Sequence, residues 1–304
     1  MSPDSIPHAP EGTTAAVEDA LPAEDVVRAS RSWWDREAEA YQAEHAPFLA
    51  GLRDAPGEGA EGAGEDEGRP AAGTGPVARP ADLPARLVWC PEGLDEADEA
   101  LLGDPAGLLG QVVLEVGAGA AQGTRWLAAQ GARAVALDLS GAMLAMRGGG
   151  TPAVVADACR VPLADASVDV AFSAYGALPF VADAGAVLGE VARVLRPGGR
   201  FVASTSHPFR WALPDDPGWD GLRVSMSYFD RRPYVERTPD GALDYVEHHR
   251  TVGDWVRLVR DAGLVLEDLL EPEWPEETTV TWGGWSPLRG EYVPGTLVMV
   301  TRRP

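Results

Sequence analysis

Apolar runs alternate with helical stretches over residues 111–206 of the chain. The strands that the apolar runs predict are 111–116, 133–138, 152–157, 168–173 and 200–206. Between them, apolar positions recur at helical spacing, which predicts helices over 124–130, 140–146 and 182–195. Strand and helix repeated in this way indicate a parallel sheet that is covered by helices on both faces.

The segments before this region follow other patterns. Residues 1–22 are polar and rich in proline, so we predict a disordered tail. The apolar positions of 23–50 recur at intervals of three, four and seven, which is typical of an amphipathic helix. Residues 51–80 are mainly Gly, Ala, Glu, Asp and Pro without periodicity and predict a flexible acidic insert. The main domain is expected to span 81–304.

The alternating pattern stops after the last of these strands. Aromatic residues gather in 208–246, and we interpret this stretch as an insertion, a cap over the functional edge of the sheet. Helical spacing returns at 249–262, and two further apolar runs predict strands over 264–270 and 296–301.

Composition narrows the classes of function. The chain has 47 acidic and 25 basic residues, a formal net charge of −22 and no lysine, and a field of this sign repels phosphate backbones. We therefore expect no nucleic-acid partner. A signal-peptide pattern and a run of about 18 apolar residues are both missing, so we expect neither secretion nor a membrane partner. Cys90 and Cys159 have no zinc-site spacing, which favours the reducing cytoplasm and no metal.

The most informative residues follow the first strand, where the chain reads EVGAGAAQG over 115–123. Glycines let the backbone turn tightly and approach a ligand, and the N-terminus of the next helix presents free N–H groups. Asp138 ends the second strand, at close to the separation of about 20 residues that is typical of a carboxylate binding ribose hydroxyls. The pattern predicts a ligand on this turn.

Two classes of ligand fit a glycine-rich turn. A dinucleotide site of the form GxGxxG requires glycine where this chain has Gln122. Glu115, two residues before the first glycine, would face a pyrophosphate unfavourably, whereas an acid there suits a positively charged ligand. The residues therefore favour a ligand that carries positive charge.

With these residues the chain resembles the class I S-adenosylmethionine-dependent methyltransferases, in the small-molecule, type-11-like group. The resemblance rests on four segments in the family's order: VVLEVGAGAAQGTRWLA, ALD, VVADACRVPLADASVDVAFSAYGALPFV and LRPGGRFVAST. It implies an α/β, Rossmann-like fold with a seven-stranded, mainly parallel sheet whose last strand is antiparallel. It also implies a lid helix at the N-terminus and methyl transfer from S-adenosylmethionine to O, N or C of a small molecule, by in-line displacement.

The resemblance implies a set of cofactor-binding residues, namely Glu115, Gly117, Ala118, Gly119, Asp138, Leu139, Asp157, Ala158, Ser173 (or Ala174) and Tyr41. In this set Glu115 would face the methionine end and Asp138 the ribose, while Asp157 would accept from the adenine amino group. Tyr41 would close over the cofactor from the lid helix. Structural roles stay open beside these: packing for the glycines, a helix cap for Asp157 and the core for Tyr41.

Methyl transfer needs alignment and, where the acceptor still carries its proton, a base. His207 directly follows the fifth strand and is the first candidate, and His248 and His249 at the next helix are the second. Tyr175, just after the fourth strand, could position the acceptor. A histidine at a strand end is also a common structural residue.

Aromatic residues of 208–246 and 274–292 could wall an apolar acceptor pocket or simply pack in the core: Trp211, Tyr228, Phe229, Trp282 and Trp285. Arg210 and Arg250 could hold an acceptor carboxylate or lie at the surface. Two other classes stay open, a non-catalytic S-adenosylmethionine-binding protein and a nicotinamide-dependent oxidoreductase. The sequence does not decide the acceptor or the oligomeric state.

Overall fold

The computed structural model describes residues 14–19, 21–49, 80–276, 281–282 and 284–304. Except for Pro80, the insert predicted at 51–80 lies outside the described residues, and so does most of the predicted tail at 1–22.

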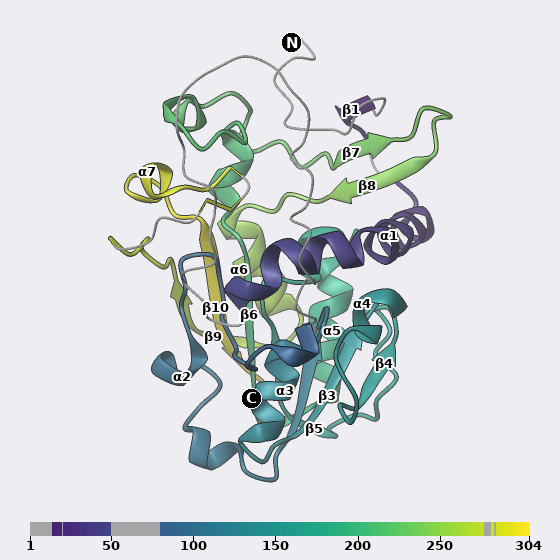
Figure 1. Cartoon of the computed structure of the whole chain (residues 1–304), viewed down its shortest axis with the longest axis vertical. Helices are drawn as coiled ribbons and strands as arrows, with labels where there is room; N and C mark the ends of the chain where they lie inside the picture. Colours follow the sequence, from purple (N-terminus) through teal and green to yellow (C-terminus); the bar gives the residue numbers. More distant parts are fainter. Residues whose placement is uncertain (1–13, 20, 50–79, 277–280, 283) are drawn as a thin grey trace.

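A seven-stranded sheet forms the centre of the structure (Figure 1). Its strand order is β4-β3-β2-β5-β6-β10-β9, and all neighbours are parallel except β10, which is antiparallel to both β6 and β9. The strands are β2 (Val112–Val116), β3 (Arg133–Asp138), β4 (Ala153–Val155), β5 (Val168–Ser173), β6 (Leu195–Ser206), β9 (Val265–Leu270) and β10 (Thr296–Arg302). The predicted Rossmann-like fold with its antiparallel last strand is confirmed.

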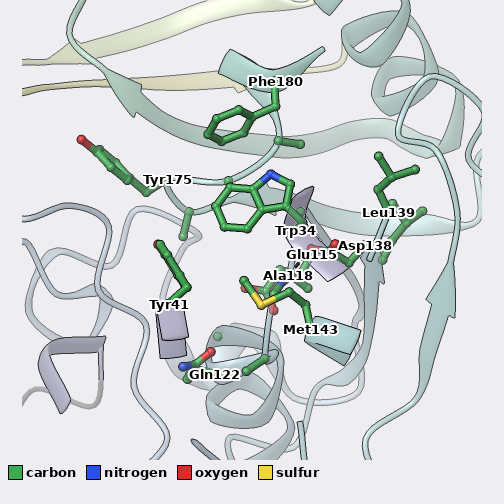
Figure 2. Close-up of a pocket in the computed structure, with 18 of the residues that line it drawn as sticks. Trp34, Tyr41, Glu115, Ala118, Gln122, Asp138, Leu139, Met143, Tyr175 and Phe180 are labelled. Atoms are coloured by element: carbon green, nitrogen blue, oxygen red, sulfur yellow. Dashed lines mark hydrogen bonds between the residues drawn. The ribbon is translucent and has the colours of Figure 1, made fainter. Parts of the chain in front are cut away.

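The strand order defines where a ligand can bind. The chain proceeds from β2 outward through β3 and β4 on one side, and through β5 and β6 on the other. In open sheets of this kind the crevice lies at the carboxyl ends of the strands, where the order reverses. Here that place is the edge at which β2 and β5 end, and a close-up of it is given in Figure 2.

Helices cover both faces of the sheet. On one face, α3 (Gln122–Ala129) packs on β2 and β3, and α4 (Gly141–Ala145) on β3 and β4. On the other face, α5 (Ala184–Val194) packs on β6 and α6 (Val252–Asp261) on β9. The short helices are α2 (Glu96–Glu99), α7 (Pro287–Gly290) and the 3-10 turns η2 (Pro80–Asp82), η3 (Pro105–Leu108), η4 (Leu178–Phe180), η5 (Pro208–Ala212) and η6 (Trp219–Leu222).

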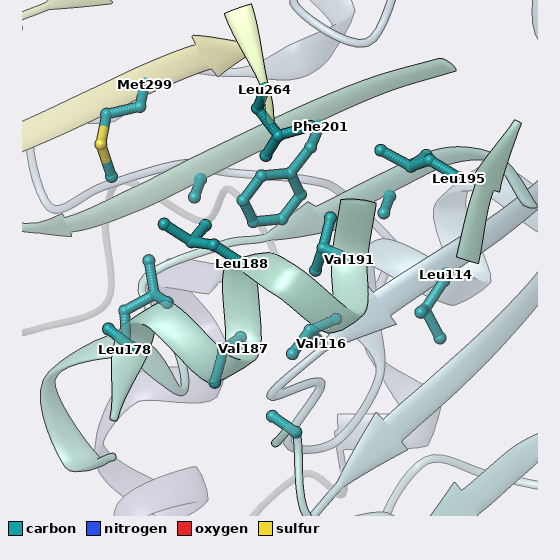
Figure 3. Packing of buried hydrophobic residues seen from close by; sticks show 14 of the residues in the cluster. Leu114, Val116, Leu178, Val187, Leu188, Val191, Leu195, Phe201, Leu264 and Met299 are labelled. Atoms are coloured by element: carbon teal, nitrogen blue, oxygen red, sulfur yellow. The ribbon is translucent and has the colours of Figure 1, made fainter. Parts of the chain in front are cut away.

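The core beneath α5 holds the strand ends in position (Figure 3). Val187, Leu188 and Val191 lie on one face of the helix and are fully buried against Leu114 and Phe201 of the sheet. Burying a side chain of this size contributes about 1.5–3 kcal/mol. The apolar spacing of the sequence therefore places α5 and fixes the edge at which β2, β5 and β6 end.

The stretch between β6 and α6 contains a second, antiparallel sheet. β7 (Tyr234–Arg237) and β8 (Leu243–Glu247) form a hairpin, and β1 (Thr14–Val17) pairs with the other edge of β7. The prediction of a disordered tail was therefore wrong at 14–17. That segment has little apolar surface to bury, but it gains backbone hydrogen bonds from an edge strand. Beside it, Arg237 donates two hydrogen bonds of 2.7 Å to Glu18.

Helix α1 (Ala23–Leu49) spans the residues predicted as the lid helix and lies between the two sheets (Figure 1). Asp35 accepts hydrogen bonds from Ser140 Oγ at 2.6 Å and Ala142 N at 3.1 Å, at the start of α4. Arg36 donates to both carboxylate oxygens of Asp244 in β8, at 2.9 and 3.0 Å. Two adjacent side chains thus anchor α1 to the main domain and to the cap.

Candidate active site

A cavity lies under α1 at the carboxyl ends of β2, β3 and β5 (Figure 2). Its volume is about 1250 Å³, including the part that opens to solvent. We call it the turn cavity, because the glycine-rich turn at 117–119 forms part of its wall. Of the predicted cofactor residues, all except Ser173 line it.

The two glycines of the turn have different surroundings. Gly117 has φ +71°, and a Cβ atom there would lie 2.5 Å from the backbone nitrogen of Ala177, so it allows two loops to pack closely. Gly119 has φ +53°, but the nearest atoms to its Cβ position are Gln42 Nε2 and Met143 Cε, at 3.9 and 4.0 Å. Gly117 therefore serves packing, and Gly119 leaves space in the turn cavity.

Asp138 connects the turn to the end of β3. Its Oδ2 accepts from Gly119 N at 2.7 Å and its Oδ1 from Ser140 N at 2.8 Å. Burial raises the pKa of this carboxyl, and the two N–H donors oppose that rise. An ionised carboxylate offers about four acceptor positions, so two remain for hydroxyl donors of a ligand.

Glu115 lies beneath the first turn of α3. Ala121, the residue before that helix, has φ +56° and makes no side-chain cap. Glu115 Oε2 supplies the missing acceptor, since both the backbone N–H of Thr124 (2.8 Å) and its hydroxyl donate to it. Burial raises the pKa of Glu115 to about 7, although the Thr124 hydrogen bonds oppose this. The side chain therefore caps α3 and also reaches the turn cavity.

The adenine-side candidates lie together in the turn cavity, where Leu139, Asp157 and Ala158 line one side. Asp157 Oδ1 accepts from Cys159 N at 2.9 Å, which fixes the carboxylate in a turn. Ser173 is different, because it still belongs to β5 and is fully buried away from the cavity. Its neighbour Ala174, the alternative named for this place, lines the cavity instead.

Helix α1 contributes several side chains to the turn cavity. Tyr41 lines it, and Figure 2 shows Trp34 pointing into the middle of the pocket. Gln42 accepts a 3.1 Å hydrogen bond from Gln122 Nε2 at the start of α3. Trp34, which the sequence places on the helix stripe with Tyr41 as a lid or core residue, lies two helical turns before Tyr41 and so on the same face. The sequence pattern gave no comparable indication that Gln42 belongs to the site.

A second cavity, of about 1270 Å³ including its open part, adjoins the first, and we call it the cap cavity. It lies between α1, the loop after β5, the cap and the segment around Trp282 and Trp285. The residues that line both cavities are all aromatic: Trp34, Tyr41, Tyr175, Phe180 and Trp282. A small molecule in the cap cavity would therefore lie next to one in the turn cavity.

Tyr175 lies where the two cavities meet. It has φ +54°, an uncommon conformation for a residue with a side chain. Its backbone N–H donates to Ser204 Oγ at 2.7 Å, and that hydroxyl donates to Trp89 O at 2.6 Å, which holds the conformation. The Tyr175 hydroxyl is 3.4 Å from Ser206 Oγ. Burial raises its pKa, so the phenol keeps its proton and can position a ligand by hydrogen bonding.

The histidine candidates line neither cavity. His207 and His248 lie in a small hollow behind Arg210 and Glu247. His207 Nδ1 accepts from Phe209 N at 3.1 Å, and its Nε2 is 2.8 Å from Glu271, so both ring nitrogens are engaged. Burial lowers the pKa of His248 to about 4. The structure does not bring these histidines to the predicted cofactor residues.

The aromatic and arginine candidates divide between site and scaffold. Trp282 and Trp285 line the cap cavity, whereas Trp211 stacks on His249 and Phe229 is 71% exposed. Tyr228 is the remaining aromatic candidate. Its hydroxyl oxygen accepts a hydrogen bond of 3.0 Å from the backbone N–H of Val252, at the start of α6.

Of the two arginines, Arg250 donates to the carbonyls of Leu178, Val181 and Ala182, a structural role. Arg210 lines the cap cavity and pairs with Glu247 at 3.0 Å. Among the described residues, no cluster of His, Cys, Asp and Glu is suited to a metal ion. Within that same part of the chain, no helix combines the length and the apolar character needed to cross a membrane.

Fold and site together define a class of protein. A Rossmann-like sheet of this order, an acid at the end of β3 and an open glycine turn after β2 are the features of a nucleoside-binding domain. A family model described as a methyltransferase domain matches residues 114–203.

Curated proteins resemble about a third of the chain. Demethylmenaquinone methyltransferases of Mycobacterium sp. (strain JLS) and Corynebacterium efficiens are 49% identical over 94 residues and 45% identical over 101 residues. These matches cover 31% and 33% of this chain and 40% and 44% of the relatives. The chain therefore spans less than half the length of these curated relatives.

Solved structures resemble the chain over a larger share of its length. An S-adenosylmethionine-dependent methyltransferase from Mesorhizobium loti is 30% identical, with a TM-score of 0.54, over 68% of this chain and 96% of that one. A 1,6-didemethyltoxoflavin-N1-methyltransferase from Burkholderia thailandensis shares the fold at 18% identity and a TM-score of 0.52, over 98% of this chain and 99% of that one. The chain belongs to the S-adenosylmethionine-dependent methyltransferases.

Proposed function

We propose that this protein transfers a methyl group from S-adenosylmethionine to a small-molecule acceptor in the cap cavity. The observation that carries the proposal is the pair of adjoining cavities, with five aromatic side chains lining both. A protein that only bound the cofactor would have no need of the second cavity. The two unpaired cysteines are in keeping with a cytoplasmic location, which is part of the proposal.

The residues of the turn cavity fit S-adenosylmethionine. Asp138 keeps two acceptor positions for the ribose hydroxyls after bonding Gly119 and Ser140. The space at Gly119 lets a ligand approach the backbone. Asp157 and Ala158 would hold the adenine, beside Leu139. When bound, S-adenosylmethionine supplies an electrophilic methyl group: the acceptor atom bonds to the methyl carbon as the C–S bond breaks, and S-adenosylhomocysteine leaves.

The chain's own residues position the reactants. Tyr175 and the other shared aromatic side chains would hold the acceptor against the turn cavity, which gives the alignment that an in-line displacement needs. Helix α1, anchored by Asp35 and Arg36, would exclude water from above. Because the pKa of Tyr175 is raised by burial, the phenol would act as a hydrogen-bonding group and not as the base.

Calorimetric titration with S-adenosylmethionine, S-adenosylhomocysteine and NADH tests the cofactor part of the proposal. We expect both sulfur compounds to bind at one site per chain and NADH not to bind. Binding of NADH alone would return the protein to the oxidoreductase class, and binding of none of the three would overturn the proposal. Transfer itself is measured with methyl-labelled S-adenosylmethionine and a panel of aromatic small molecules, by mass spectrometry of the labelled product.

A further inference from the structure

One histidine lines the cap cavity. The chain has five histidines, of which His8 lies outside the described residues. The three histidines considered so far, His207, His248 and His249, line a separate small hollow. His45, near the C-terminal end of α1, lines the cap cavity instead. Its side chain is 15% exposed, so the ring is mostly buried in the wall of that cavity.

The ring of His45 lies beside the boundary between the two cavities. Tyr41, one helical turn earlier, and Trp282 both line the turn cavity as well as the cap cavity. The centroid of the His45 ring is 4.4 Å from that of Tyr41, edge to face. It is 4.0 Å from the centroid of Trp282, on which it is stacked at an interplanar angle of 19°. These contacts hold His45 where an acceptor in the cap cavity would meet a ligand in the turn cavity.

The ring nitrogens of His45 are not engaged. Among the residues that the structure describes, neither nitrogen makes a hydrogen bond, and Glu44 Oε1 lies 4.0 Å from Nε2, which is too far for one. His207, by contrast, has a partner on each ring nitrogen. Burial lowers the pKa of His45, although the Glu44 charge opposes this, so the neutral imidazole is favoured. A neutral imidazole has a lone pair that can accept a proton from a molecule in the cavity.

The other titratable groups in the described lining of the cap cavity are less suited to accept a proton. Burial raises the pKa of its tyrosines, so the phenols keep their protons: Tyr41, Tyr175 and Tyr245. The Glu247 charge raises the pKa of Arg210, which stays ionised. The carboxylates are paired with arginine or open to solvent: Glu37 with Arg36, Glu247 and Asp215 with Arg210, and Glu44, which is 75% exposed.

We infer that His45 is the general base of the transfer and that the acceptor carries an O–H or N–H group. This inference rests on the proposed function and deepens the same site. The acceptor oxygen or nitrogen bonds to the methyl carbon, the C–S bond breaks with its electron pair going to sulfur, and the acceptor proton passes to a ring nitrogen of His45. The imidazolium then loses this proton to water. Glu44 stabilises the positive charge that His45 gains in the step.

Access to the ring nitrogens can be tested without an acceptor. The full chain is saturated with S-adenosylhomocysteine, whose binding is measured first, and then treated with diethylpyrocarbonate, which modifies neutral imidazole. Peptide mass spectrometry locates the modified residues. We expect His45 to react faster than His207, whose ring nitrogens are both engaged. Slower reaction of His45 than of His207 would show that no free nitrogen faces the cavity and would overturn the inference.

His45→Phe separates proton transfer from ring stacking, because it keeps a flat ring against Trp282 and removes both nitrogens. The matched control is His249→Phe, which makes the same change in a ring that is stacked on Trp211 and lines neither cavity. Transfer is measured from methyl-labelled S-adenosylmethionine to a panel of phenols and anilines that includes 2-naphthol, with 2-methoxynaphthalene as a counterpart that has no acceptor proton.

We expect kcat with the panel acceptors to fall about 100-fold or more in His45→Phe, while KM and the affinity for S-adenosylhomocysteine stay unchanged. His249→Phe should keep the activity of the wild type, and 2-methoxynaphthalene should not be methylated. An unchanged kcat in His45→Phe overturns the inference, and so does a wild type that binds S-adenosylhomocysteine but methylates none of the phenols and anilines. Failure of the wild type to bind S-adenosylhomocysteine would instead refute the proposed function.

Discussion

Replacing Asp138 by alanine separates the ligand-binding part of the site from its scaffold. The carboxylate accepts one backbone N–H on each oxygen, from Gly119 and Ser140, and has two acceptor positions left for ribose hydroxyls. A hydrogen bond to a charged group contributes about 1.5–3 kcal/mol, and we take about 3 kcal/mol for the pair because such terms are not additive. Asp138→Ala should therefore weaken binding of S-adenosylhomocysteine by about 100-fold.

The same substitution also affects the fold, so it needs a matched control. Losing the acceptor for two N–H donors should lower the free energy of unfolding by about 1–3 kcal/mol. Asp183 caps α5 by accepting from Ala186 N at 2.9 Å and lines neither cavity. Asp183→Ala should cost about 1 kcal/mol in stability and leave the ligand affinity unchanged.

Calorimetric titration and thermal unfolding of the wild type and both variants provide the assay. The expected pattern is that both variants lose stability and only Asp138→Ala loses affinity. If folded Asp138→Ala bound S-adenosylhomocysteine within about threefold of the wild type, less than the effect of one hydrogen bond, Asp138 would not be the ribose acceptor.

Three further predictions follow from the geometry. Gly117→Ala should unfold the turn, because its Cβ would lie 2.5 Å from Ala177 N, whereas Gly119→Ala should stay folded and lose affinity for S-adenosylhomocysteine; equal melting temperatures of the two would contradict this. Glu115 has a folded pKa of about 7, above its ordinary 4.5, so its contribution to stability is present at low pH and is lost as pH rises toward 7. Chemical denaturation should show that the free energy of unfolding of Glu115→Gln rises by about 3 kcal/mol relative to that of the wild type between about pH 4.5 and pH 7. A stability difference between the two proteins that stays constant over this pH range would refute the raised pKa of Glu115. Arg36→Ala removes the half-exposed pair with Asp244 and should speed dissociation of S-adenosylhomocysteine about two- to fivefold in stopped-flow measurements, while an unchanged rate would show that the pair does not hold the lid.

The main sheet was predictable because its signals are local. The bounds of β3 and β5 agree with the apolar runs at 133–138 and 168–173. The start of α3 was less predictable, because Ala121 precedes it in a left-handed conformation and no side chain of the usual capping type marks the position. β1 could not be predicted from its own residues, since its hydrogen bonds come from β7, more than two hundred residues later.

The site was predictable to the extent that it is built from single strand–turn–helix units. Gly119 and Asp138 follow directly from the ends of β2 and β3. Adjacency to a strand end did not fix the direction of a side chain, however. His207 follows β6 as expected, but its ring caps η5 and pairs with Glu271, away from both cavities. Ser173 ends β5 with its side chain buried, and the cavity begins one residue later.

The turn cavity and the cap cavity also differ in how much of each lies within the part of the chain that matches a known family. The matched methyltransferase domain, residues 114–203, contains the glycine turn and Asp138. Trp34, Arg210 and Trp282 lie outside it and come from three separate parts of the chain. Of these three, only Arg210 lines the cap cavity without also lining the turn cavity, so we expect substitution of Arg210 to affect acceptor binding and not cofactor binding. The matches to demethylmenaquinone methyltransferases cover 31% and 33% of this chain, so a proposal for the acceptor has to rest on the residues of the cap cavity.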